Sequence, residues 1–288
     1  MLYGAIETGG TKIVCAKVDD SGQILDSVRF ATESPDLVVK HIVDYYMNSE
    51  ITGLGIGSFG PVDLNTASPT YGYILDTPKS GWSYYPFLNK IKEQIKVPVA
   101  IDTDVNCACL GEMTYGAAQG MKTAIYITIG TGIGVGVGIG GDTLKGMLHP
   151  EAGHILIRRN SKDIYRGKCP FHRDCFEGLA AGPAIEERAG KPAYDIPEGD
   201  FIWEIEADYI GQALADYVLV YSPECIVLGG GVMEQVHLFP MIRERLKQYL
   251  NGYIRTSRIS DLDKYVVPSV LEGKQAILGA FCLAKQAV

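Results

Sequence analysis

Four side chains in one polar stretch of the chain have the types and spacing of a metal site. Cys169, His172 and Cys175 form a Cys-x-x-His-x-x-Cys sequence, and His154 lies upstream of it. Two thiolates and two imidazoles suit tetrahedral zinc, and four protein ligands leave no open coordination position. The pattern predicts a structural zinc ion; the alternative is a set of unrelated loop residues.

Three glycine-rich segments could bind phosphate, because glycine lets backbone N–H groups approach phosphate oxygens closely. Two of them are turns between short apolar runs, and the third follows a buried strand, a placement that suits a nucleotide. The residues concerned are Gly9, Gly10, Thr11 and Lys12 in the first turn, Gly130, Thr131 and Gly132 in the second, and Gly229, Gly230, Gly231, Val232 and Met233 in the third.

The two turns repeat one pattern, since Thr8, Gly10 and Thr11 correspond to Thr128, Gly130 and Thr131. A matching hairpin at the head of each half indicates two structurally related domains. Tight hairpins need glycine for steric reasons as well, so one turn alone would be weak evidence. Neither a Walker-type phosphate loop nor a Rossmann fingerprint in its strand–turn–helix context is present.

A carboxylate suited to proton transfer follows the strand expected over residues 97–101. In Asp102-Thr103-Asp104-Val105-Asn106, Asp104 stands where a helix is expected to begin. It could simply cap that helix. It could also be a general base, because a kinase needs a carboxylate that orients an alcohol and accepts its proton.

The elements that would position these residues alternate between strands and helices, which predicts an α/β protein. We expect hairpins over 3–18 and 123–139, strands at 53–58 and 225–228, and helices over 36–49, 180–189 and 200–221. The expected domains are an N-terminal lobe at 1–118 and a C-terminal lobe at 119–288, with the last helix able to pack back on the N-terminal lobe.

Composition limits the partners of the chain. It has 288 residues, 47% hydrophobic and 21% charged, with a net charge of −8 and no cluster of Lys and Arg. Nucleic-acid binding needs a concentrated basic surface, so we expect no such partner. No apolar run approaches the ~20 residues that span a bilayer, and Met1 leads directly into an apolar strand. We therefore expect a cytoplasmic protein without a membrane partner.

Taken together, these segments resemble the ROK family of sugar kinases and repressors over nearly the whole chain. The matching pieces are Glu7–Lys12, Gly60–Asp63, Asp102–Asn106, Thr128–Gly134, Glu151–His154, Cys169–Glu177 and Gly229–Val232. The opening segment, Thr77–Trp82 and Cys169–His172 resemble the fructokinase branch of that family.

The resemblance implies a two-lobed, actin-like ATPase (ribonuclease H-like) fold in which ATP and sugar meet between the lobes. Asp104 would be the catalytic base that activates a hydroxymethyl oxygen, and fructose the preferred hexose, giving fructose 6-phosphate. Mg²⁺ would accompany ATP and bridge its phosphates. The positions that would bind the sugar are Gly60, Thr103, Glu151, His154 and Glu177. His154 would also be a zinc ligand. Pro183 and the three glycine segments would lie near the nucleotide.

Three departures from the family pattern stand in this chain: Glu7 replaces the usual Asp, Thr103 replaces Asn, and His172 replaces a zinc-binding cysteine. Neutral imidazole is a good zinc ligand, so the metal prediction is unaffected.

The alternatives to a fructose kinase are a kinase for mannose, glucose or N-acetylmannosamine, a non-catalytic sugar sensor, or a repressor. We expect no repressor, because the first turn begins at residue 7. A homodimer is expected from the resemblance.

Overall fold

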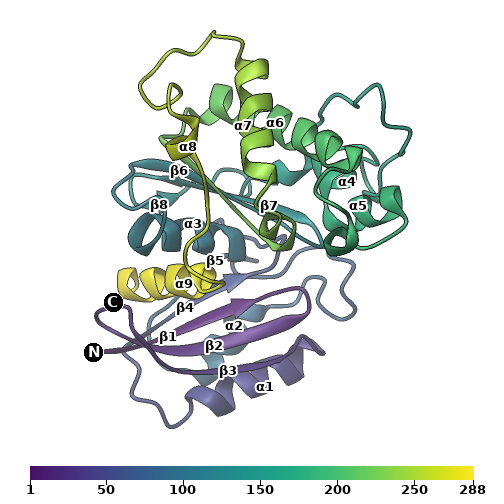
Figure 1. Ribbon diagram of the computed structural model, residues 1–288. Coiled ribbons are helices and arrows are strands. Elements are labelled where there is room, and N and C mark those ends of the chain that lie inside the picture. The colour runs from purple at the N-terminus through teal and green to yellow at the C-terminus, as the bar shows by residue number, and fades with distance from the viewer. The chain divides into compact units, whose positions relative to one another are not determined.

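The structure is a computed structural model that describes all residues, 1–288. The chain forms two compact units. The first unit comprises Met1–Gln119, Gly136–Pro150 and Leu271–Val288, and the second comprises Gly120–Val135 and Glu151–Val270. Each unit combines strands and helices (Figure 1).

The first unit is built on a five-stranded sheet with the order β3-β2-β1-β4-β5. Its strands are β1 (Leu2–Thr8), β2 (Lys12–Asp19), β3 (Ile24–Ala31), β4 (Gly53–Ser58) and β5 (Val99–Thr103). β1 pairs antiparallel with β2 and parallel with β4, and β4 pairs parallel with β5. The chain therefore leaves β1, β4 and β5 at the same edge of the sheet.

Successive side chains of a strand point to opposite sides, and those of β1 and β2 enter two separate cores, one on each face of the sheet. Ile6 and Ile13 belong to one apolar core, and Ala5 and Ala16 belong to another. The first core contains side chains of two helices, α1 (Pro35–Tyr46) and α2 (Phe87–Gln94), and the second core those of α3 (Asp104–Tyr115) and α9 (Gln275–Gln286).

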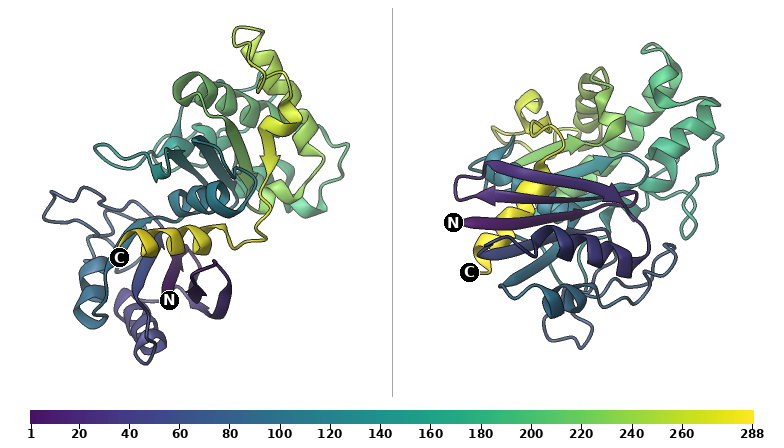
Figure 2. Two further views of the ribbon diagram at one scale, coloured as in Figure 1. Left: turned by 90° about the vertical axis from the view of Figure 1, so that its left-hand side faces the viewer. Right: turned by 90° about the horizontal axis from the view of Figure 1, so that it is seen from below.

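Helix α9 is the end of the chain and packs closely against α3 and the strands β1 and β4 (Figure 2). The close approach depends on glycine: a Cβ atom on Gly279 would lie 1.6 Å from the carbonyl oxygen of Cys107. Any larger residue at this position would push α9 away from α3.

The second unit contains the strands β6 (Thr123–Ile129), β9 (Cys225–Gly229) and β10 (Val266–Pro268), and β9 pairs parallel with both β6 and β10. The second sheet has the order β10-β9-β6-β7-β8, and the division between the two units falls within β7. Its remaining strands are β7 (Ile133–Ile139) and β8 (Asp142–Thr143).

Helices and short 3₁₀ segments complete the second unit. Helix α6 is buried along most of its length, and α4, α5 and α7 pack against it. These elements are η1 (Ala152–His154), α4 (Phe176–Ala180), α5 (Gly182–Ala189), η2 (Ala193–Asp195), α6 (Phe201–Tyr221), η3 (Gly231–Glu234), α7 (Leu238–Leu250) and α8 (Leu262–Tyr265).

The elements expected from the sequence are present, with shifted ends. The strand expected at residues 97–101 covers 99–103, and the helix expected near Val105 begins at Asp104. β3, α2 and β10 were not expected, because their apolar periodicity is weak or their length is short. None of the helices combines the length and the apolar character that crossing a bilayer requires.

Candidate active site

The first unit brings three of the predicted segments together at one edge of its sheet. Thr8 pairs with Ser58, and Ser58 pairs with Thr103, each at the carboxyl end of its strand. The first glycine turn, the loop that starts at Phe59, and Asp104 follow directly after these three residues. Ligands of open α/β sheets bind at this edge. The register thus places the first glycine turn and a carboxylate where one substrate could contact both.

Backbone N–H groups of the first turn are open to a ligand. Gly9 N–H donates to the carbonyl oxygen of Lys12, which closes the turn. The N–H groups of Gly10 and Thr11 have no hydrogen-bond partner within the chain, and both residues are exposed. Free amides in a tight turn form a concave anion-binding site. The geometry is consistent with the predicted role of this turn.

Two charged groups beside this turn are Glu7 and Lys79. Burial raises the pKa of the Glu7 carboxyl, while the positive charges of Lys12 and Arg29 oppose the shift. The Lys79 ammonium donates a hydrogen bond to the carbonyl oxygen of Gly10. A carboxylate and an ammonium therefore lie at the turn in addition to its amides.

Asp104 is the first residue of α3 and does not cap it. The cap is Thr103, whose hydroxyl oxygen accepts a hydrogen bond from Asn106 N–H at 3.1 Å. The capping alternative for Asp104 is therefore wrong. Its Oδ1 accepts a hydrogen bond from Val105 N–H at 2.8 Å. A carboxylate at a helix N-terminus is stabilised by the helix dipole, which fixes the position of a potential base.

Thr103 and Gly60 were predicted to contact sugar. Thr103 is only 2% exposed, and its hydroxyl is engaged in the helix cap. Gly60 precedes a cis peptide bond to Pro61, and a Cβ atom on Gly60 would lie 3.3 Å from the ring of His149. Their contact with a sugar stays a prediction.

His149 holds the loop that follows β4. Its Nε2 accepts a hydrogen bond from Val62 N–H at 3.2 Å, and the residue is 6% exposed. Burial lowers the pKa of its imidazole, which favours the neutral form that this bond requires. Nothing in the sequence linked His149 to the Gly60–Asp63 segment, because the two are far apart in the chain.

Beside Asp104, Asp102 is a fully buried carboxylate. Its Oδ1 accepts hydrogen bonds from Thr103 N–H and Asn106 Nδ2, both at 2.7 Å. Its Oδ2 accepts from Thr143 Oγ1 at 2.5 Å and pairs with Lys145 Nζ at 3.2 Å. A buried carboxylate needs such partners. These contacts link β5, the start of α3 and the segment around β8. They therefore help to fix the position of the backbone that carries Asp104.

In the second unit, the second turn and the third glycine segment also share a sheet edge. Thr128 at the end of β6 pairs with Gly229 at the end of β9. Gly230 has a φ of +88°, and a Cβ atom there would lie 2.4 Å from the carbonyl oxygen of Ile129. Only glycine allows this approach. Val232 and Met233 follow in η3 and are buried.

Helix α5 begins beside the second turn. Gly182 N–H donates to the carbonyl oxygen of Gly130 at 2.8 Å, and Pro183 occupies the first turn of the helix. The N–H groups of Thr131 and Gly132 have no partner within the chain. The predicted nucleotide positions of this unit are therefore neighbours, although the sequence separates them widely.

The four predicted zinc ligands converge, and their donor atoms all lie within 4.8 Å of one another. His154 Nδ1 is 3.7 Å from Cys169 Sγ and 3.6 Å from Cys175 Sγ, and His172 Nδ1 is 3.7 Å from Cys169 Sγ. A tetrahedral zinc with ordinary bond lengths separates sulfur and nitrogen by about 3.6 Å. The donor set fits zinc.

Glu151, His154 and Glu177 form a polar group next to the zinc cluster. His154 directs Nδ1 at the thiols, and its Nε2 lies on the side of Glu177, 4.0 Å from Oε1. The other Glu177 oxygen accepts a hydrogen bond from Ile133 N–H at 2.9 Å. Surrounding protein raises the pKa of Glu151 to about 7, and the charge of Glu177 adds to the shift. Carboxylates and an imidazole suit the hydroxyls of a sugar.

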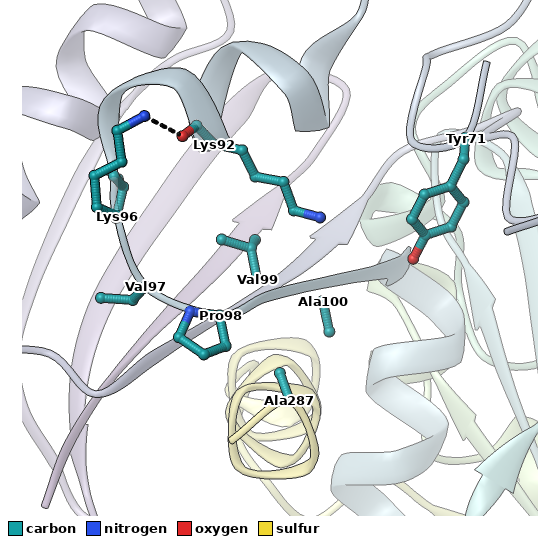
Figure 3. A pocket seen from close by; sticks show the side chains of 9 residues that line it. Tyr71, Lys92, Lys96, Val97, Pro98, Val99, Ala100 and Ala287 are labelled. Carbon is teal, nitrogen blue, oxygen red and sulfur yellow. Dashed lines mark hydrogen bonds between the residues drawn. The ribbon is translucent and has the colours of Figure 1, made fainter. Parts of the chain in front are cut away.

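A hollow of the first unit lies elsewhere. It measures about 740 Å³ and is lined by Lys92, Lys96, Tyr71 and the residues at the start of β5 (Figure 3). None of the predicted site residues lines it. Its only polar contact drawn in Figure 3 joins Lys96 Nζ to the carbonyl oxygen of Lys92. We assign it no role in catalysis.

Two glycine turns with unpaired amides, and a carboxylate at a sheet edge, are the features expected of a sugar kinase. A model of the ROK family matches residues 3–287. The chain belongs to the ROK family.

Relatives of known sequence cover the whole chain. A Bacillus subtilis (strain 168) protein with a provisional fructokinase assignment is 48% identical over 288 residues, which are 100% of this chain and 96% of that protein. A fructokinase of Pediococcus pentosaceus is 44% identical over 288 residues, 100% of this chain and 99% of that enzyme.

Solved structures agree with the fold. A ROK hexokinase from Thermus thermophilus superposes with a TM-score of 0.81 and 26% identity, covering 99% of this chain and 98% of that one. A ROK glucokinase from Streptomyces griseus was solved in complex with glucose and AMPPNP. It superposes with a TM-score of 0.75 and 25% identity, covering 99% of this chain and 100% of that one. The expected α/β, actin-like ATPase fold is confirmed.

Proposed function

We propose that this protein is an ATP-dependent kinase that phosphorylates free fructose at its terminal hydroxymethyl oxygen and produces fructose 6-phosphate. The names of its relatives at 48% and 44% identity support the choice of sugar. The solved complex of a ROK glucokinase with glucose and AMPPNP supports a nucleotide triphosphate and a free hexose as the substrate classes.

One observation carries the proposal: the register of the first sheet. Thr8, Ser58 and Thr103 pair side by side, so the first phosphate turn, the loop from Phe59 and the Asp104 carboxylate leave the sheet at one edge. Phosphoryl transfer depends mainly on positioning and electrostatic stabilisation. A phosphate-binding turn and a base on the same rigid sheet meet that requirement.

Asp104 is the proposed base. Its carboxylate accepts a hydrogen bond from the hydroxymethyl group, orients the oxygen toward the terminal phosphorus of ATP, and takes the proton as the oxygen–phosphorus bond forms. The bond from that phosphorus to the bridging oxygen breaks, and ADP leaves. The Val105 N–H contact and the helix cap by Thr103 keep the carboxylate in place.

Backbone amides would hold the phosphates of ATP. In the first unit these are the free N–H groups of Gly10 and Thr11, and in the second those of Thr131 and Gly132. Pro183 and Gly229–Met233 would lie along the nucleotide. Mg²⁺ would accompany ATP and would neutralise part of the charge of its phosphates. Glu7 fits a contact to that ion through water, because its carboxyl is desolvated and a cation would stabilise the charged form.

Glu151, His154 and Glu177 would bind the sugar hydroxyls. Zinc, when bound to His154, Cys169, His172 and Cys175, fixes the loop that carries Glu177 and the ring of His154. The group binds and orients the sugar and takes no proton from it in this scheme.

The test is a coupled assay of ADP release with Mg-ATP and a panel of free sugars: fructose, mannose, glucose and N-acetylmannosamine. We expect fructose to give the highest kcat/KM. A higher value for another hexose would overturn the choice of fructose while the kinase assignment stands, since epimers are distinguished by one or two hydrogen bonds. ADP release that no sugar accelerates would overturn the kinase assignment.

A further inference from the structure

Lys79 lies against the first phosphate turn although it is far from that turn in the sequence. Its ammonium donates a hydrogen bond to the carbonyl oxygen of Gly10, and a Cβ atom on Gly10 would lie 3.8 Å from Lys79 Nζ. Lys79 is a lysine from a distant segment whose side chain reaches the backbone of the first turn. It is part of Thr77–Trp82, the segment to which no function has been assigned above.

The segment that carries Lys79 is firmly anchored. Trp82 is 1% exposed, its Nε1 donates to the carbonyl oxygen of Glu33 at 3.0 Å, and its ring packs 5.0 Å from that of Phe59. Trp82 N–H also donates to the carbonyl oxygen of Lys79 at 3.1 Å. The ammonium is thus held in position before any ligand arrives, which is the condition for electrostatic catalysis.

No carboxylate pairs with the Lys79 ammonium. Its contacts are the Gly10 carbonyl oxygen and the face of the Phe59 ring, whose centroid is 5.2 Å away. Burial lowers the pKa of Lys79. A half-buried cation without a counter-ion is stabilised when an anion binds next to it.

The turn supplies the place for that anion. The N–H groups of Gly10 and Thr11 have no partner within the chain, and both residues are exposed. A phosphate oxygen that accepts from the Gly10 N–H would lie within reach of the Lys79 ammonium, because the Cβ position of Gly10 is 3.8 Å from Lys79 Nζ. Amides and a lysine together are a common phosphate-binding combination.

We propose that Lys79 is a further catalytic residue, whose ammonium contacts the terminal phosphoryl group of ATP at the first turn. The inference rests on the proposed function, because it assigns a role within the same reaction. The bond from phosphorus to the sugar oxygen forms, the bond to the bridging oxygen breaks, and the sugar proton goes to Asp104. Lys79 keeps its own proton and stabilises the negative charge on the transferring group.

The alternative is that Lys79 only fastens Thr77–Trp82 to the turn. The two roles differ in what Lys79→Met changes. Loss of a preorganised donor to the transferring group lowers kcat by about 100-fold and leaves the fructose KM within about 2-fold. Loss of a structural contact lowers the melting temperature and leaves kcat of the folded enzyme nearly unchanged.

The experiment compares wild type with Lys79→Met, Lys79→Arg and the control Lys92→Met, which removes a lysine lining the hollow of the same unit (Figure 3). Steady-state rates with Mg-ATP and fructose, melting temperatures, and the binding of AMPPNP and ADP are measured. We expect Lys79→Met to lose about 100-fold in kcat and about 10-fold in AMPPNP affinity, with ADP affinity unchanged. Lys79→Arg should recover part of the rate, and Lys92→Met should match wild type.

The binding arm keeps this inference separate from the choice of reaction. If wild type phosphorylates fructose but Lys79→Met has a normal kcat and a normal ratio of AMPPNP to ADP affinity, the role of Lys79 is refuted and the proposed function stands. If wild type has no sugar-dependent turnover, the proposed function fails. The affinity ratio then still decides whether Lys79 contacts the terminal phosphoryl group.

Discussion

The two glycine turns share a backbone pattern but differ in the charge beside them. At the first turn, the Lys79 ammonium bonds to the carbonyl oxygen of Gly10. At the second, the Glu177 carboxylate accepts a hydrogen bond from Ile133 N–H at 2.9 Å. The repeated residues therefore supply free amides in both places, while residues remote in the sequence decide what each turn can do. A cation suits the transferring phosphoryl group, and a carboxylate suits the hydroxyls of a sugar.

The turns also differ in how tightly they are packed. A Cβ atom on Gly10 would meet Lys79 at 3.8 Å, an ordinary contact, whereas one on Gly132 would lie 2.7 Å from Glu177 Oε2. Position 10 therefore tolerates a methyl group, whereas position 132 does not unless the Glu177 carboxylate moves. The second turn is therefore coupled, through Glu177, to the group that we propose binds the sugar.

The largest expected effect concerns the unit of the first turn, to which we assign proton removal. Asp104→Asn should lower kcat by about 10³-fold, because an amide cannot accept the hydroxyl proton. Binding of ADP and of fructose, measured by calorimetry, should stay near the wild-type values. A variant with nearly normal turnover would remove Asp104 as the base.

A large effect is also expected at the zinc cluster, on the side of the second turn. Cys169→Ser, or treatment with a chelator, should release about one zinc ion per chain and loosen the loop that carries Glu177. We expect the fructose KM to rise by at least about 10-fold with a smaller change in ADP affinity. Elemental analysis of the purified protein is the control, and finding no zinc in it would contradict the assignment.

A matched pair of turn variants tests the difference in packing directly. Gly132→Ala should displace the Glu177 carboxylate and raise the fructose KM by about 10-fold, since a binding group is moved. Gly10→Ala should leave the fructose KM near wild type. If the two variants changed the fructose KM equally, the Glu177 carboxylate would not be the reason that the two turns differ.

The smallest effect concerns pH and the loop held by His149. Burial lowers the pKa of the His149 imidazole in the native protein. Below about pH 6.5 the unfolded chain therefore takes up a proton on His149 more readily than the native protein does. The free energy of unfolding should therefore fall as the pH drops from 6.5 toward the lowered native pKa. His149→Gln, whose side-chain oxygen can still accept from Val62 N–H, should show a shallower fall, because it has no imidazole to titrate.

Thermal unfolding of wild type and His149→Gln between pH 7.5 and pH 5 provides the measurement, with His41→Gln as the control for an exposed histidine. Identical pH dependence in wild type and His149→Gln would contradict the account of His149.

Much of this site could be predicted from sequence because its parts are local. The glycine turns, Asp104 after its strand and the Cys-x-x-His-x-x-Cys cluster each lie within a few residues, and backbone conformation or ligand chemistry restricts the residue types. Strands β4 and β9 were likewise visible as short apolar runs bounded by turns.

The remainder depends on contacts between distant segments. Lys79 approaches Gly10, and His149 approaches Val62, only because the sheet register and the packed Trp82 bring them together. Nothing in the sequence indicated that Gly136–Pro150 would belong to the first unit. Edge strand β3 escaped prediction because most of its side chains are exposed and its alternation is weak.

The central claim, phosphoryl transfer from ATP to the terminal hydroxymethyl oxygen of fructose, is tested most directly by identifying the product. Purified enzyme is incubated with Mg-ATP and ¹³C-labelled fructose, and the products are examined by ¹³C and ³¹P NMR. The account predicts one sugar phosphate, with phosphorus coupled to the C6 carbon, formed in step with ADP. Phosphate on another carbon, or ADP that accumulates with inorganic phosphate and unmodified fructose, would contradict it.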